Sequence, residues 1–243
     1  MTRALRETVD SALGKLHRDD PVLPRTGGPA GNAQLTALIG LVLLVLFLAE
    51  LVTLIDMHGL ISWHIAIGVA LVPPSLAKTA TTGWRIVRYY AGVRPYRQAG
   101  PPPLLLRLLG PLVVGGTLAV LGSGLALIPL GPDAGRRTLF AALGQQVSPL
   151  TIHQASFIVW AVATGLHVLA RAVPAFGIVT TSGPNGRRPG GTATRGVILL
   201  TTLAVAAVAA AILLASSHSW TSGGDYRFHR HSPDSSTQQH GRG

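Results

Sequence analysis

The sequence contains no cysteine, and few of its residues carry a charge. The missing cysteine excludes disulfide bonds, iron–sulfur clusters, covalent c-type haem attachment and thiol catalysis. Charged residues make up 12% of the 243, about half of the roughly 25% that soluble proteins carry. Outside the polar ends the only carboxylates are Glu50, Asp56 and Asp133, too few to favour hydrolysis by paired carboxylates. Much of the surface is therefore expected to face an apolar medium.

The net charge of +11 does not indicate a nucleic-acid partner. A nucleic-acid-binding protein gathers its basic residues along one face or in one patch. Here they fall between long apolar runs, which is the distribution of loops at a membrane surface. We therefore predict a lipid bilayer, and no nucleic acid, as the partner of this surface.

Five apolar runs are each long enough to cross a bilayer, which requires about 20 residues of helix. A backbone in lipid must satisfy its own hydrogen bonds, so runs of this length form helices. The sequence predicts an all-α membrane protein, a bundle of about five transmembrane helices, between an N-terminal segment (1–33) and a disordered polar tail (216–243). The predicted helices lie near residues 34–55, 61–90, 104–130, 150–173 and 196–215.

The distribution of lysine and arginine predicts the orientation of the bundle. Fourteen of them lie in the N-terminal segment, in the loops after the second and fourth helices, or in the helix ends beside those loops. Five fall on the opposite side, counting the tail, and Lys78 lies within the second run. Cytoplasmic loops are enriched in basic residues. We therefore expect a multi-pass protein of the plasma membrane, with its N-terminus in the cytoplasm and its C-terminus outside.

The N-terminal segment has apolar residues at helical spacing, at positions 5, 9, 13 and 16. This pattern is typical of an amphipathic helix on the inner leaflet, and a loosely ordered tail is the alternative. Pro73 and Pro74 interrupt the second run, where each removes a backbone donor and favours a kink.

Ionisable residues inside the second and fourth helices are the strongest functional signal, because such residues are costly in lipid. The second helix contains His64 and Lys78, and the fourth contains His153 and His167. The members of each pair are 14 residues apart, which places them on one face of their helix, about 21 Å apart along its axis. Both helices run inward, so we expect His64 and His153 at one outer level and Lys78 and His167 at an inner level.

Two histidines at the same depth on facing helices suit b-type haem, whose iron takes an imidazole on each face. The His153–His167 spacing and the strings HIAIGVALVPPSLAK and IHQASFIVWAVATGLHVLARA resemble the ligand helices of the membrane di-haem cytochrome b superfamily. The resemblance covers residues 35–215 in architecture but only the second and fourth helices in motif. It implies a haem b between His64 and His153, a second haem at His167, and a partner catalytic oxidoreductase subunit.

Lys78 stands where the pattern of this superfamily would place a fourth histidine. A lysine binds iron only when its amine is neutral. The alternatives are pairing with a haem propionate or a quinone-like head group, or extension of the side chain to the inner interface. Glu50, near the depth of His64, could accept a hydrogen bond from a ligand histidine or face the outer water.

The sequence therefore favours an electron-transfer subunit, rather than a self-contained enzyme, with metal ligands at His64, His153 and His167 and Lys78 near the inner site. Its electron partners would be a quinone pool or a cytoplasmic donor, and an outer acceptor. A haem-free accessory or scaffold subunit related to cytochrome b is the alternative. A small transporter using Glu50 and Lys78 ranks lowest, because the two residues lie at opposite depths and no inverted repeat is evident.

Overall fold

The computed structural model describes residues 3–13, 15, 20–101, 104–142, 144–180, 189–217 and 220. Within these ranges the chain forms a long helical bundle, and five helical segments are long and apolar enough to cross a membrane. The spanning helices are α2 (Gly28–Thr53), α3 (Met57–Ala70) continued by α4 (Val72–Tyr90), α6 (Leu104–Gly135), α7 (Pro149–Thr180) and α8 (Thr192–Ala215). The prediction of a helical membrane protein with about five spans is confirmed at this level.

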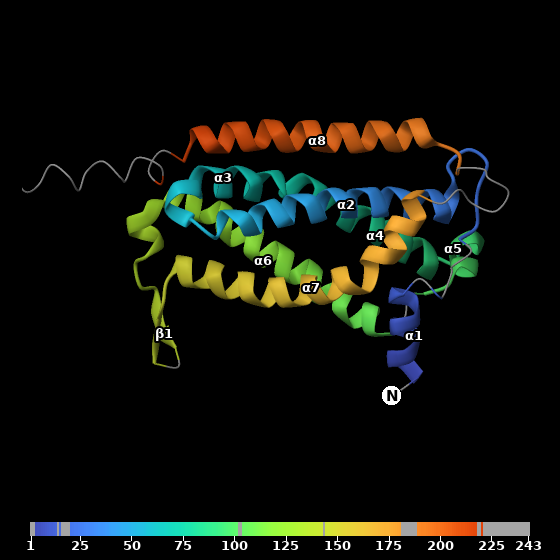
Figure 1. Ribbon diagram of the computed structural model, residues 1–243, viewed down its shortest axis with the longest axis horizontal. Helices are drawn as coiled ribbons and strands as arrows, with labels where there is room; N and C mark the ends of the chain where they lie inside the picture. The colour runs from blue at the N-terminus through green and yellow to red at the C-terminus, as the bar shows by residue number, and fades with distance from the viewer. Residues whose placement is uncertain are drawn as a thin grey trace, which may run out of the picture.

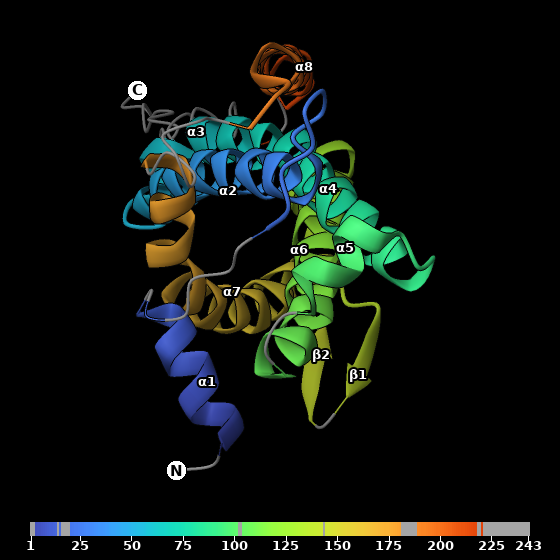
Figure 2. The ribbon, with the colours of Figure 1, turned by 90° about the vertical axis from the view of Figure 1, so that its right-hand side faces the viewer.

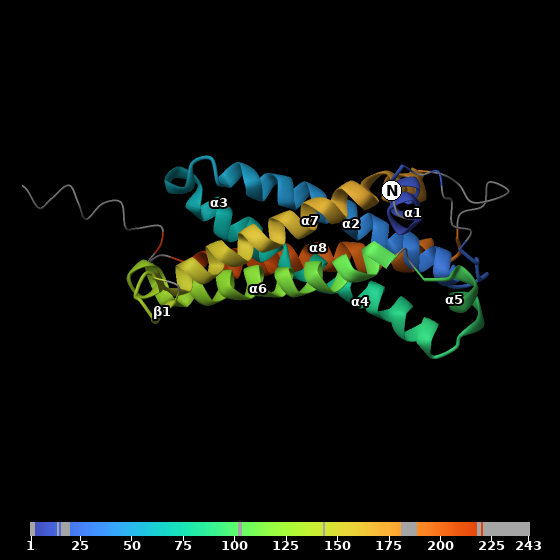
Figure 3. The same ribbon diagram turned by 90° about the horizontal axis from the view of Figure 1, so that it is seen from below.

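Four of the spans form a four-sided bundle, and the fifth lies outside it. The span α3–α4 contacts α2 and α6, and α7 contacts the same two helices from the other side, so α3–α4 and α7 are diagonal partners. Figure 3 shows α6 and α7 side by side, and they form the most extensive pairing in the bundle. Figure 2, which looks along the bundle, shows α8 outside the other helices, where it packs on α3 and α4.

The two ends of the bundle, visible in Figure 1, are formed by different elements. One end holds the start of α2, the end of α4, the short helix α5 (Arg94–Ala99), the start of α6, the end of α7 and the start of α8. We call it the arginine-rich end, because Arg85, Arg88, Arg97, Arg107 and Arg171 lie there. The opposite end carries an antiparallel hairpin of β1 (Phe140–Ala142) and β2 (Gln145–Val147), and we call it the hairpin end. The sequence analysis did not predict these two short strands.

The predicted end of the third helix agrees with the structure, where a glycine breaks the helix. Gly131, with φ of 71° and ψ of 172°, breaks α6 directly after the predicted end at residue 130. Pro73 and Pro74 occupy the first turn of α4, and Leu71, which joins α3 to α4, has helical φ and ψ of −69° and −23°. The other ends differ: α2 begins six residues earlier than predicted, and α7 continues to Thr180 with Pro174 in its interior.

The segments flanking the spans are described in part. Residues 3–12 form the helix α1 (Arg3–Ala12), which packs on α6 and α7 at the arginine-rich end. After α8, the indole Nε1 of Trp220 donates to the main-chain oxygen of Leu127 at 3.0 Å. Residues 221–243 lie outside the described part of the chain, so the disorder predicted for the tail stays a prediction.

Large apolar side chains on the outside of the bundle support the membrane assignment. Leu169 in α7 is 75% exposed, and Leu200 in α8 is 67% exposed. A soluble protein seldom exposes apolar side chains in continuous patches. The interior is held by a few close contacts, such as Trp160 of α7, which packs edge-on against Phe47 of α2 with ring centroids 4.8 Å apart. The same indole donates to Thr117 of α6 at 2.8 Å.

Candidate functional site

His64 and His153 lie close together near the hairpin end of the bundle. His64 lies in the second turn of α3, and His153 lies in the first turn or two of α7, the helix diagonally opposite. The centroids of the two imidazole rings are 6.4 Å apart, and the ring planes are inclined at 81°. The structure thus brings together the pair that the sequence analysis placed at one level.

The Nδ1 atom of His64 is held by two acceptors from α2. Glu50 Oε1 lies 2.9 Å from Nδ1, and Thr53 Oγ1 lies 3.0 Å from it. The Thr53 hydroxyl donates its own hydrogen to the main-chain oxygen of Glu50 at 2.6 Å, so toward His64 it accepts. In the neutral imidazole the proton therefore lies on Nδ1 and the lone pair on Nε2. Of the two alternatives for Glu50, the contact with a histidine nitrogen is the one observed.

The Nδ1 atom of His153 is also held by acceptors, here from α6. Val120 presents its main-chain oxygen at 3.1 Å, and Ser123 its hydroxyl oxygen at 3.1 Å. The Ser123 hydroxyl donates to the main-chain oxygen of Ala119 at 2.6 Å. A carbonyl oxygen can only accept, so in neutral His153 the lone pair also lies on Nε2. Gly124 makes room for this ring, because a Cβ there would lie 3.1 Å from Cε1 of His153.

This arrangement fits a metal held between two imidazoles. In the described part of the chain neither Nε2 atom has a hydrogen-bond partner. Two imidazoles on opposite sides of one metal, each with a bond of about 2 Å, have ring centres about 6 Å apart, close to the observed separation. Histidine ligands of metals regularly donate their other ring nitrogen to a carboxylate or a carbonyl oxygen, as Glu50 and Val120 allow here.

A bare metal ion would find too few ligands at this site. Among the described residues there is no group of three or more histidine, aspartate or glutamate side chains that could hold one. Protein zinc sites use three or four such ligands. An iron that arrives with four porphyrin nitrogens needs only two more, and the pair His64 and His153 can supply them.

The inner level differs from the outer one, because Lys78 turns toward α2. Its Nζ donates to the main-chain oxygen of Thr36 at 3.1 Å. Gly40, one turn further along α2, leaves space for the amine, since a Cβ there would lie 2.6 Å from Nζ. The Lys78 amine thus bonds the backbone of α2 inside the bundle.

His167 lies at the same level as Lys78, but its Nδ1 atom has no hydrogen-bond partner among the described residues. Helices α2 and α7 are antiparallel and meet at Phe47 and Trp160. Seven residues from this contact toward the arginine-rich end lead to Gly40 on α2 and to His167 on α7, an equal rise of about 10 Å. The His167 Nδ1 atom is buried without a hydrogen bond, as is the Thr164 hydroxyl one turn before it on α7. His64 and His153 have anchored rings, but His167 does not.

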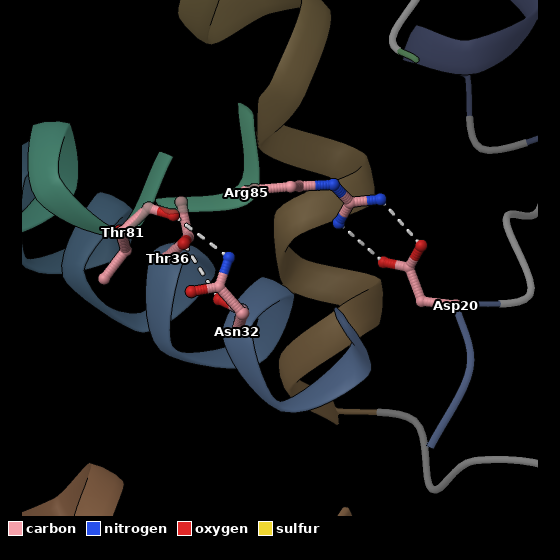
Figure 4. A network of polar contacts seen from close by, with 5 residues as sticks. All are labelled: Asp20, Asn32, Thr36, Thr81 and Arg85. Atoms are coloured by element: carbon pink, nitrogen blue, oxygen red, sulfur yellow. Dashed lines mark hydrogen bonds and ion pairs between the residues drawn. The ribbon is translucent and has the colours of Figure 1, made fainter. Parts of the chain in front are cut away.

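Charged residues that the sequence analysis did not single out lie next to the inner level, toward the arginine-rich end. Arg85 of α4 forms a two-pronged ion pair with Asp20, at 2.8 Å and 2.9 Å (Figure 4). Asn32 of α2 donates to the main-chain oxygen of Thr81 at 3.1 Å in the same view. Arg171 lies four residues after His167 on the same face of α7. The sequence signals for Arg171 were this spacing and its place among the basic residues of the predicted cytoplasmic side, and Ser123 and Thr53 gave none.

No protein-family model, no curated protein and no solved structure matches this chain. The resemblance to the di-haem cytochrome b superfamily therefore stays a prediction. Any function has to be argued from the geometry of the bundle itself.

Proposed function

We propose that this protein transfers electrons within a membrane through one b-type haem bound between α3 and α7, with His64 and His153 as the axial ligands. The observation that carries the proposal is the short separation of the two imidazoles together with their matching hydrogen bonds at Nδ1. Each ring has its Nδ1 proton directed to fixed acceptors, each keeps its Nε2 lone pair available, and the ring centres are 6.4 Å apart. A metal between the two rings would therefore find two imidazoles whose Nδ1 protons are already held by protein acceptors.

The chain's own residues would orient the ligands and set their basicity. Glu50 and Thr53 hold His64 from α2, and Val120 and Ser123 hold His153 from α6. Because the four acceptors lie on the two helices between the ligand helices, all four sides of the bundle contribute to the site. When bound, a haem supplies an iron that gains and loses one electron. The carboxylate of Glu50, 8% exposed, would make the His64 imidazole more electron-rich.

The proposal includes the topology and the partners expected from the sequence. The N-terminus and the arginine-rich end would face the cytoplasm, and the haem would lie nearer the outer surface of a plasma membrane. An electron carrier requires a donor and an acceptor. We propose that electrons pass from a quinone pool or a cytoplasmic donor to an outer acceptor, and that the chain has the partner catalytic oxidoreductase subunit that the resemblance implies.

We restrict the proposal to one haem because the inner level offers a single imidazole. The Nζ atom of Lys78 is engaged by the Thr36 carbonyl, and His167 has no second histidine opposite it among the described residues. A ratio of one haem per chain in the purified protein would agree with this. A ratio of two would require His167 as a ligand, as the resemblance implies.

The absorption spectrum of the purified protein, expressed with a haem supply, tests the proposal. We expect a Soret band and a reduced alpha band in the wild type, and the loss of most bound haem in His64→Ala and in His153→Ala. His58→Ala is the matched control, because His58 is an exposed histidine in the first turn of α3 and should leave the spectrum unchanged. Absence of both bands from folded wild-type protein would refute haem binding.

A haem-free accessory or scaffold subunit is the second candidate. It is favoured by Lys78, which stands where the superfamily pattern has a histidine and which bonds the backbone of α2. In that case neither His64 nor His153 would bind a cofactor. His64→Ala and His153→Ala would then leave folding and partner binding unchanged, and no variant would differ in colour.

A further inference from the structure

A second site is indicated at the inner level, where two cations approach each other inside the bundle. Lys78 extends from α4 onto the backbone of α2 at Thr36 and Gly40. Eleven residues along each helix from the contact between Phe47 and Trp160 lead to Thr36 on α2 and to Arg171 on α7, which places Arg171 at the level of the lysine. The charges of Lys78 and Arg171 interact with each other and with His167.

These two cations lack a counter-ion in the described part of the chain. Asp20 is the carboxylate within electrostatic range of Arg171, but both of its oxygens are bonded to Arg85. Lys78 uses one of its three donors, and the guanidinium of Arg171 makes no hydrogen bond or ion pair with any described residue. Charges withdrawn from water are ordinarily paired. A bound anion would therefore stabilise this pair of positive charges.

The neighbouring polar atoms could complete the coordination of such an anion. The Nδ1 atom of His167 is buried without a partner, and it can donate once it carries the ring proton. The Thr164 hydroxyl, one turn before His167 on α7, is also unpartnered and can donate. Lys78 and Arg171 are only partly buried, so a ligand could reach them. The surrounding helices are apolar, which favours an anion attached to an apolar chain over a small hydrated ion.

We propose that Lys78 and Arg171, with His167, bind the phosphate or carboxylate head group of an anionic lipid at the inner level of the bundle. Lys78 would then be a lipid ligand and not an iron ligand. The site does not depend on the proposed haem, because it uses none of the residues that hold His64 and His153. It would place a bound lipid between the arginine-rich end and the middle of the bundle.

Native mass spectrometry of the delipidated protein in detergent, titrated with phosphatidylglycerol or with phosphatidylcholine of the same chains, tests the proposal. We expect the first phosphatidylglycerol to bind at least about tenfold more tightly than phosphatidylcholine. Lys78→Gln and Arg171→Gln should each weaken that binding about tenfold, since each removes a charge-assisted hydrogen bond. Arg171→Lys, which keeps the charge, should restore most of the affinity.

Arg88→Gln is the control for unspecific attraction by the arginine-rich end. Arg88 lies at the same end but stacks on Trp84, with 4.2 Å from its guanidinium carbon to the ring centroid. We expect it to bind the lipid as the wild type does. Equal affinity for the two lipids, or an equal loss in Arg88→Gln, would overturn the proposal. Circular dichroism and size-exclusion chromatography establish that each variant is folded before it is compared.

Two further measurements are needed. One distinguishes a lipid head group from a free anion, and the other tests the lipid site independently of haem binding. If millimolar inorganic phosphate displaces phosphatidylglycerol, the site takes a free anion, and the assignment to a lipid is wrong. The Soret band of Arg171→Gln should equal that of the wild type. A protein without any Soret band that still prefers phosphatidylglycerol through Lys78 and Arg171 would refute haem binding and support the lipid site.

Discussion

At the residue scale, the chemistry of the outer site depends on the acceptors that face each imidazole. His64 and His153 were visible in the sequence as ionisable residues in apolar helices. Their tautomers were not visible, because these depend on Glu50, Thr53, Val120 and Ser123, which come from two other helices. Gly124 has no side chain and so leaves space for His153, because a methyl group there would lie against the imidazole ring.

Glu50→Gln is expected to raise the midpoint potential of the bound haem. A nearby carboxylate stabilises the more positive, oxidised iron, so its loss favours the reduced state. The glutamine oxygen can still accept from His64, which keeps the ring in place. We expect a rise of several tens of millivolts, on the order of the 59 mV that correspond to a tenfold change for a one-electron couple. Potentiometric titration of the alpha band measures it.

Asp133→Asn is the control for this measurement. It removes the same charge from an exposed position at the hairpin end, where water screens the carboxylate. Its effect should be much smaller than that of Glu50→Gln. An equal shift in both variants would contradict a specific role for Glu50 beside His64.

At the scale of the elements, one indole connects three of the spanning helices. Trp160 of α7 packs on Phe47 of α2 and donates to Thr117 of α6. Gly116 permits this approach, since a Cβ there would lie 3.3 Å from the Cα atom of Trp160. The contact also sets the register between α2 and α7, and with it the level of His167 relative to Gly40.

Trp160→Phe is expected to lower the free energy of unfolding by about 1 kcal/mol, because the ring contacts remain but the hydrogen bond to Thr117 is lost. Chemical unfolding in a fixed detergent mixture, followed by circular dichroism, measures the change. Trp63→Phe is the matched control: Trp63 is 64% exposed on α3 and should change the free energy by less than about 0.5 kcal/mol. If the two variants were equally destabilised, the indole of Trp160 would have no special role.

The helix ends show which local signals can be trusted in a membrane chain. The break at Gly131 agrees with the predicted end of the third helix, because glycine readily adopts the positive φ seen there. Pro174, by contrast, lies inside α7 and does not end it. Membrane helices tolerate such prolines where neighbouring groups satisfy the freed backbone, which a sequence does not reveal.

At the scale of the whole molecule, five spans place the start of α2 and the end of α8 at opposite ends of the bundle (Figure 1). The same arrangement gathers the basic segments at one end and the hairpin at the other. Which end faces the cytoplasm is a property of the molecule in its membrane, and the excess of arginine favours the arginine-rich end.

The absence of cysteine makes the orientation directly testable, since a single introduced cysteine is the only thiol. Gln145→Cys in β2 is exposed at the hairpin end, and Gln98→Cys in α5 is exposed at the arginine-rich end. A membrane-impermeant maleimide should label Gln145→Cys in intact cells and Gln98→Cys only after permeabilisation. The reverse pattern would contradict a cytoplasmic N-terminus, and the cysteine-free parent controls for background labelling.

The sequence alone determined that this chain crosses a membrane, about where its five spans lie, and which ionisable residues they contain. These properties are local: they follow from run length, helical period and the cost of charge in lipid. The tertiary structure decided which of these residues meet. His64 reaches His153, and Lys78 reaches the backbone of α2, because α3–α4 and α7 pack diagonally around α2 and α6. Such pairings depend on contacts between residues far apart in the chain, which spacing along one helix cannot specify.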